Sequence, residues 1–162
     1  MSLFSGRFFF LILFIFFFND CSSSAKFRRL YAKSENFSDF YLIRPYSPAL
    51  ALWSFNVKIL KYRDKFKSEE IPVQMRDFDL KAGEYIHFRL PIGHYKITAQ
   101  YFKNSEKIIF IDGKSEKFMH FYLFSDGFFS GTELFFQEIE KKDALGFLLE
   151  GSNMAEHRES EP

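Results

Sequence analysis

The stretch that decides the fold runs from Tyr85 to Tyr101 and reads YIHFRLPIGHYKITAQY. On each side of its centre, apolar residues alternate with polar ones. A period of two places one set of side chains on one face of an extended chain, so the pattern predicts two strands, Tyr85–Leu90 and Tyr95–Tyr101. Between them, Pro91-Ile92-Gly93 predicts a tight turn, because proline fixes its own φ and glycine tolerates a positive one. We therefore expect a hairpin here.

Similar segments flank this stretch on both sides. Short runs rich in aromatic and β-branched residues, separated by turn residues, favour strands over helices. The further expected strands are Phe40–Arg44, Trp53–Leu60, Val73–Leu80, Lys107–Ile111, Phe118–Phe124 and Thr132–Phe136. The connection Asp112–Ser115 predicts a second hairpin between the fourth and fifth of these. Glu138–Glu150 carries a partial apolar stripe at helical spacing, so the fold class is predicted as mainly β with one short C-terminal helix.

Four motifs along the chain carry a family resemblance. They are Tyr41-Leu-Ile-Arg44-Pro45, Gly83-Glu-Tyr85, Pro91-Ile-Gly93-His-Tyr95 and Ile111-Asp-Gly113-Lys114. With them, Phe40–Glu150 resembles an uncharacterised bacterial lipoprotein family, a domain of unknown function. The resemblance implies an antiparallel β-sandwich, Ig-like or prealbumin-like, of the kind found in carboxypeptidase-regulatory and PEGA-like modules. It implies no activity.

The N-terminus has the pattern of an export signal. Arg7 precedes an unbroken apolar run, Phe8–Phe18, which is shorter than a membrane-spanning helix and has the length of a signal-peptide core. Cys21 follows closely, so we predict a lipoprotein signal peptide over residues 1–20, with cleavage before Cys21 and lipid on that cysteine. The preceding Phe18-Asn19-Asp20 departs from the usual lipobox. An uncleaved membrane-anchored helix and an ordinary cleaved signal peptide stay open as alternatives.

The mature chain is expected to have three parts. Residues 21–38 are polar and basic and predict a lipidated tether, residues 39–150 the sandwich, and residues 151–162 a disordered tail. Several acyl chains on Cys21 would hold the protein permanently on a membrane. Ser22 after the cysteine favours, by resemblance to a known sorting signal, the outer membrane. The expected location is therefore the cell envelope of a diderm bacterium, most specifically its outer membrane.

Composition narrows the function classes. A single cysteine excludes an intramolecular disulfide and a C-x-x-C metal or redox site. A formal net charge of +1 provides no general attraction to nucleic acid, so no nucleic-acid partner is expected.

Candidate chemistry is sparse. Three histidines suggest a zinc site, but no local ligand motif accompanies them, so no metal or cofactor is predicted. They are His87, His94 and His120. His87 is expected at the surface, on the face opposite Ile86 and Phe88. Ser125 and Asp126 could belong to a hydrolase, but the chain has no G-x-S-x-G elbow, and no enzyme is predicted.

Two further features bear on binding. Phe128 and Phe129 are adjacent in the loop Ser125–Gly131, where both cannot easily bury on one strand face. They predict a contact with a protein partner or the membrane surface, the alternative being a loop folded over the end of the sandwich. Arg44 is interpreted as a solvated strand end, because Pro45 follows it.

Three function classes follow from these observations. The leading hypothesis is a non-catalytic protein-interaction module, anchored in the envelope by lipid and bound to an envelope protein. The second is a small apolar-ligand or lipid-binding carrier, because an aromatic-rich β shell could hold a cavity. A periplasmic hydrolase stays as a third alternative.

Overall fold

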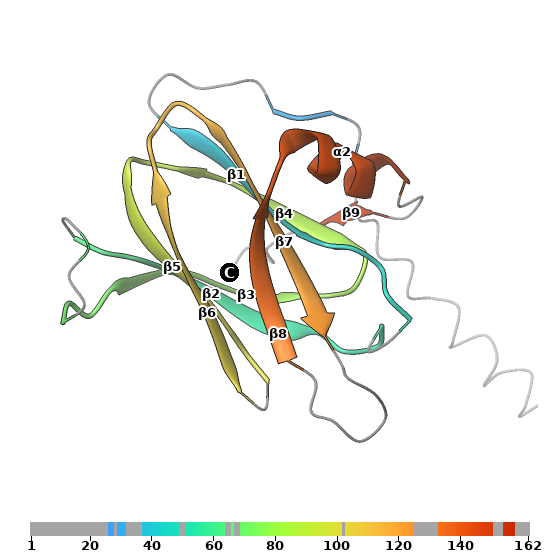
Figure 1. The fold of residues 1–162 in the computed structure, drawn as a ribbon, viewed down its shortest axis with the longest axis horizontal. Coiled ribbons are helices and arrows are strands. Elements are labelled where there is room, and N and C mark those ends of the chain that lie inside the picture. The colour runs from blue at the N-terminus through green and yellow to red at the C-terminus, as the bar shows by residue number, and fades with distance from the viewer. Residues whose placement is uncertain are drawn as a thin grey trace, which may run out of the picture.

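The computed structural model describes residues 26–27, 29–31, 37–48, 51–63, 66, 69–101, 103–124, 133–150 and 154–157. They form a β-sandwich of two sheets with one short helix on its outside (Figure 1). The predicted fold class, mainly β with a short C-terminal helix, is confirmed. The predicted signal peptide and Cys21 lie outside the described residues.

The structure places nine strands and one helix in the described residues. They are β1 (Ser38–Arg44), β2 (Phe55–Lys61), β3 (Val73–Leu80), β4 (Glu84–Leu90), β5 (Gly93–Gln100), β6 (Asn104–Ile111), β7 (Glu116–Phe124), β8 (Glu133–Ile139), α2 (Lys141–Glu150) and β9 (Ala155–Glu156).

The strands divide into a five-stranded sheet, β8-β7-β1-β4-β9, and a four-stranded sheet, β3-β2-β5-β6. Neighbouring strands are antiparallel except in the pairs β1–β7 and β4–β9, which are parallel. The sandwich is thus antiparallel with two exceptions. Strand β1 lies in the middle of its sheet and is buried along its whole length.

The main core lies between the sheets. Strands β1 to β8 contribute alternate side chains to it, as the period of two predicts. In β2 these are Phe55, Val57 and Ile59, all buried, with Asn56 and Lys58 facing outward. Burial of such aromatic and branched side chains stabilises the fold by roughly 1.5–3 kcal/mol each.

Both predicted hairpins are wrong. Strand β4 pairs with β1, and β5 pairs with β2 and β6, so Pro91-Ile92-Gly93 carries the chain from one sheet to the other. The connection after β6 crosses in the same way, because β7 pairs with β1 and β8. A period of two identifies the side chains that face the core but not the strand that pairs alongside. The Tyr95 hydroxyl donates to the Pro91 carbonyl at 2.8 Å and closes the first crossing.

The helix and last strand also differ from prediction. Strand β8 continues to Ile139, three residues beyond the predicted Phe136, and α2 begins only at Lys141. The pairing of Phe118 with Ile139 explains the longer strand, since β7 supplies a partner along the whole of it. None of the helices in the described part of the chain has the length and apolar character to cross a membrane.

A second apolar cluster covers the outer face of the five-stranded sheet. We call it the outer core; its buried members are Tyr41, Ile43, Tyr85, Phe118, Ala144, Leu148 and Met154. Helix α2 packs here against β7 and β1 (Figure 1). Phe27 and Leu30 also pack against this cluster.

Two predicted boundaries therefore need correction. Within the predicted tether, Lys26 forms a β-bridge with Ala155, and the Phe27 N–H donates to the Met154 carbonyl at 3.2 Å. Within the predicted disordered tail, β9 adds to the edge of the five-stranded sheet. Both segments pack because they carry apolar side chains that complete the outer core, which composition alone did not reveal.

Candidate partner-binding groove

Within the described residues, the edge of the five-stranded sheet at β4 is paired over only part of its length. Strand β9 pairs with β4 at Glu84 and Tyr85 alone. Ala155 N–H donates to the Gly83 carbonyl at 2.9 Å, and His157 N–H to the Tyr85 carbonyl at 2.8 Å. Because alternate residues of a strand direct their backbone groups to the same neighbour, those of His87 and Arg89 face this edge too. On this side of β4, the pairing with β9 ends at Tyr85.

A groove lies beside this edge, with a volume of about 460 Å³. We call it the edge groove; its lining residues are Arg76, Ile86, His87, Phe88, Arg89 and His157. The Arg76 guanidinium lies 5.7 Å from the centre of the Phe88 ring. The lining thus combines two apolar side chains with two arginines and two histidines, and its formal charge is positive.

A buried carboxylate organises the basic side of the groove. Asp39 on β1 has a side chain only 2% exposed, and its Oδ1 lies 2.8 Å from His87 Nε2 and 3.5 Å from Arg89 Nε. The register of β1 and β4 opposes Asp39 to Arg89 directly. Since a buried charge needs partners, Asp39 holds both basic side chains at the groove.

Tyr31 covers His87 from outside. Their rings stack at 4.1 Å with an interplanar angle of 9°. The Tyr31 N–H donates to the Tyr41 hydroxyl at 2.9 Å, and the Tyr31 hydroxyl donates to Glu156 Oε1, also at 2.9 Å. Burial raises the pKa of Tyr41 to about 12, so this hydroxyl keeps its proton. Tyr31 therefore joins the N-terminal segment to β1, β4 and β9.

A second histidine–carboxylate pair lies at the β9 end of the groove. His157 Nδ1 is 3.3 Å from Glu84 Oε2, which also accepts a hydrogen bond from Lys81 N–H at 2.8 Å. Burial would raise the pKa of Glu84, but these contacts outweigh it and lower the pKa below its ordinary value. Glu84 thus stays charged and fixes His157.

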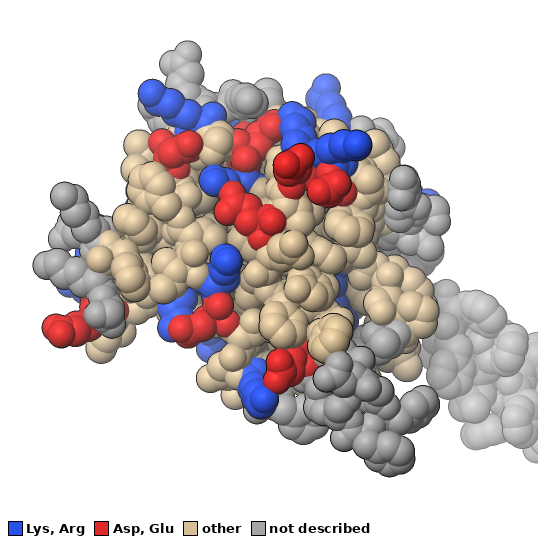
Figure 2. Space-filling view, viewed as in Figure 1, with Lys and Arg blue, Asp and Glu red and all other residues tan. Residues whose placement is uncertain are grey.

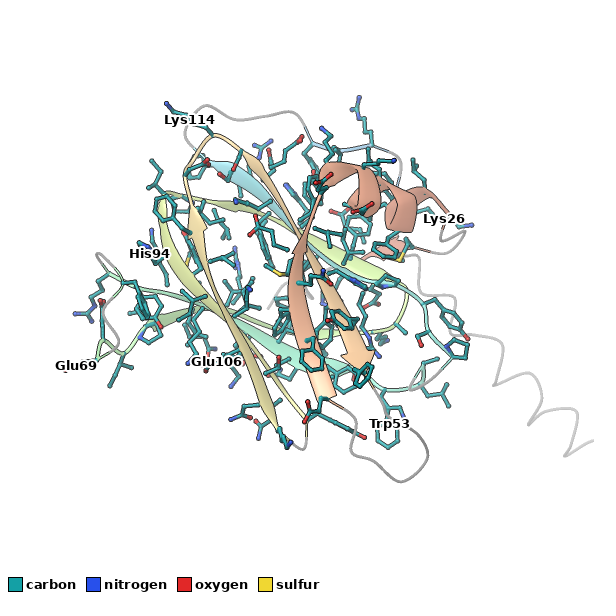
Figure 3. All side chains as sticks on the ribbon, viewed as in Figure 1. Lys26, Trp53, Glu69, His94, Glu106 and Lys114 are labelled. Carbon is teal, nitrogen blue, oxygen red and sulfur yellow. The ribbon has the colours of Figure 1, made fainter. Side chains whose placement is uncertain are left out.

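The three histidines considered for zinc lie apart. His87 is on β4 and His120 on β7, with β1 between them. His94 is on the four-stranded sheet, at the far side of the view in Figure 3 from Lys26. His94 contacts the ring of Phe110, and His120 those of Tyr122 and Phe147. No cluster of three metal-ligating side chains occurs among the described residues.

The expected surface position of His87 is wrong, although its face was predicted correctly. Its side chain is 9% exposed because Tyr31 lies over it and Asp39 beneath it. Sequence reasoning missed Tyr31, Asp39, Arg76 and His157 as neighbours of the groove. Contacts such as Asp39–His87 join positions far apart in the chain, and no local pattern announces them.

Several predicted site residues cannot be placed. Cys21, Phe128 and Phe129 lie outside the described residues, as do Ser125 and Asp126.

Elsewhere the described surface carries mixed charge. On the face seen in Figure 2, basic and acidic side chains are interspersed. Ion pairs such as Lys117–Glu138 and Lys141–Glu116 join β7 to its neighbours β8 and α2.

No protein-family model, curated protein or solved structure matches this chain.

Proposed function

We propose that this chain is a bacterial envelope lipoprotein, cut before Cys21 and anchored by lipid in the outer membrane. Its sandwich acts as a non-catalytic interaction module that binds a partner protein along the edge groove. We also propose that the sandwich is Ig-like or prealbumin-like and that the chain belongs to the bacterial lipoprotein family that it resembles.

One observation supports the proposed binding of a partner along the edge groove. The β4 edge already accepts a short strand from the chain itself, β9, through two backbone hydrogen bonds. The backbone groups of His87 and Arg89 continue the same edge. An extended segment of another protein could add there in the same manner, a common mode of peptide recognition.

The lining of the groove indicates the partner's chemistry. Arg76 and Arg89 could each engage a carboxylate, and Arg–carboxylate hydrogen bonds are among the stronger ones in proteins. Phe88 and Ile86 offer apolar contact next to them. An extended segment that alternates acidic and apolar residues therefore fits best.

The carrier hypothesis receives no comparable support. Eighteen buried side chains from the two sheets form the main core, and the edge groove touches this core only at Ile86 and Phe88. A carrier would need a cavity between the sheets large enough for its ligand.

Photo-crosslinking in cells tests the interaction. A photoreactive residue at Met75, exposed and next to Arg76 on β3, is expected to give a discrete adduct. The same residue at Lys107, exposed on β6, serves as the control. The R76Q/R89Q variant should lose the adduct, whereas K107Q should keep it, with unfolding temperatures showing that each variant folds. Equal adducts at Met75 and Lys107 would contradict the proposal.

The anchor is tested by the intact mass of the membrane-extracted protein beside the Cys21→Ser variant. A chain starting at Cys21 and carrying acyl groups, both lost in the variant, is expected. A full-length, unmodified mass would contradict the lipid anchor and indicate that an uncleaved N-terminal helix holds the protein on the membrane.

A further inference from the structure

One end of the sandwich carries four exposed apolar side chains, which we call the apolar tip. Tyr46, Leu52 and Trp53 belong to the β1–β2 connection, and Phe124 ends β7; their exposed fractions are 66, 99, 55 and 51%. Because β1 and β7 are parallel, Arg44 and Phe124 end their strands at the same end of the sheet. Exposed large apolar side chains gathered at one end of a fold mark a binding surface.

The described N-terminal segment starts at this same end. Lys26 bridges to Ala155, which pairs with Glu84, and Glu84 in turn pairs with Arg44. The Arg44 guanidinium donates to the Trp53 carbonyl at 2.8 Å. Figure 3 shows Lys26 and Trp53 on one side of the molecule, with Glu69, His94 and Lys114 on the other.

The chain between the proposed anchor and this end is short. Only four residues, Ser22–Ala25, separate Cys21 from Lys26. Five residue steps span at most roughly 17 Å, even when fully extended. A lipid on Cys21 would therefore hold Lys26, and the end of the sandwich around it, close to the bilayer surface.

We propose that the apolar tip inserts into the interface of the membrane that holds the anchor, so that the sandwich stands end-on with the Pro91–Gly93 end away from the lipid. The inference rests on the proposed lipidation of Cys21. Tryptophan and tyrosine side chains favour the membrane–water interface, since an apolar ring and a polar group both find their surroundings there. Lys26 and Arg29, both exposed, lie on the N-terminal segment and can meet anionic headgroups.

End-on seating also orients the edge groove. Strand β4 starts at Glu84, near Lys26, and ends at Leu90, beside the far end of the sandwich. The groove would then run away from the membrane, open to a partner at the surface.

Trp53 is the only tryptophan, so its fluorescence reports on the tip directly. The full lipidated chain is placed in phosphatidylethanolamine–phosphatidylglycerol vesicles with or without brominated acyl chains. We expect blue-shifted emission, loss of most of it to brominated lipid, and little loss to aqueous acrylamide. The matched control, W53F/I92W, moves the tryptophan to exposed Ile92 at the opposite end and should show the reverse pattern.

The outcomes separate the two proposals. An unlipidated chain in the mass measurement would overturn both. A lipidated chain whose Trp53 is quenched by acrylamide and not by brominated lipid would overturn end-on insertion alone. Shielding of Trp53 from both quenchers in cell-derived membranes would assign the tip to a protein partner instead, which also overturns the inference.

Discussion

At the scale of single residues, Arg44 is the most unusual member of the sandwich. Among the described residues it is the largest of the fully buried side chains, with 1% exposure. Its Nη1 donates to the carbonyls of Trp53 and Leu80, at 2.8 and 2.6 Å, and its guanidinium lies 4.5 Å from the Phe55 ring centre. Burial lowers the pKa of Arg44 to about 10, and nearby Glu84 opposes the change. The arginine thus remains charged and links β1 to the β1–β2 connection and to the end of β3 in the other sheet.

Replacing Arg44 by methionine should destabilise the protein strongly. The substitution keeps a long apolar stem but leaves two carbonyls without their charged donor, which we expect to cost on the order of 3 kcal/mol. Urea unfolding of the full chain in detergent measures the loss. The control, Lys107→Met on the exposed face of β6, should change stability by less than about 0.5 kcal/mol. An Arg44→Met variant as stable as the wild type would contradict this role.

The interpretation of Arg44 as a solvated strand end is wrong for an instructive reason. Pro45 does end the strand, as expected, but the side chain at the last position of β1 points inward, where the two sheets approach. Alternation from Phe40 and Leu42 places position 44 on the core face. The pattern was therefore present, but the proline that follows Arg44 favoured the interpretation as a solvated strand end.

At the scale of elements, α2 packs on the outer face of β7 and buries side chains there. His120 on β7 lies under the helix, with ring centres 4.6 Å from Phe147 and 5.0 Å from Tyr122. Its pairing partners, Ile43 and Gln137, carry no charge. Burial therefore lowers the pKa of His120 below its ordinary 6.5.

This burial predicts a pH-dependent stability. When the folded pKa lies below the unfolded one, the unfolded chain takes up the proton first as pH falls. The stabilising contribution of neutral His120 is then present above about pH 6.5 and is lost below it. The His120→Phe variant should lose less unfolding temperature than the wild type between about pH 7.5 and pH 5. The pKa values of Glu84 and Asp112 are also lowered, so their protonation at low pH destabilises both proteins in the same way. An identical pH dependence in both would show that His120 contributes nothing.

Elements could be predicted better than their partners. Alternation placed every strand from β1 to β8 to within a few residues, because the side-chain period depends only on the local chain. It failed at Pro91–Gly93, since either a hairpin or a crossing satisfies the same pattern. The edge groove was predicted less well. Strand β4 supplies four of its six lining residues, but His157 and Tyr31 reach it from the two ends of the described chain.

At the scale of the whole molecule, the two ends of the described chain support each other. Phe27 contacts the ring of Tyr85, with centres 5.6 Å apart, while Met154 is buried in the same outer core. The backbone bond between Phe27 and Met154 joins the segments directly. Each segment also contacts the sheet, β9 through β4 and the N-terminal segment through Tyr31, so each is ordered only in part by the other.

This dependence predicts non-additive mutations. Phe27→Ala and Met154→Ala should each cost roughly 2 kcal/mol, because both side chains are wholly or partly buried. Loss of either releases part of the other segment, so the double variant should lose about 1 kcal/mol less than the sum of the two. The control pairs Phe27→Ala with Ile109→Ala, which lies in the main core on the other sheet and should be additive. Equal additivity in both double variants, measured by urea unfolding, would mean that the two segments order independently. The N-terminal segment would then not be fixed by β9.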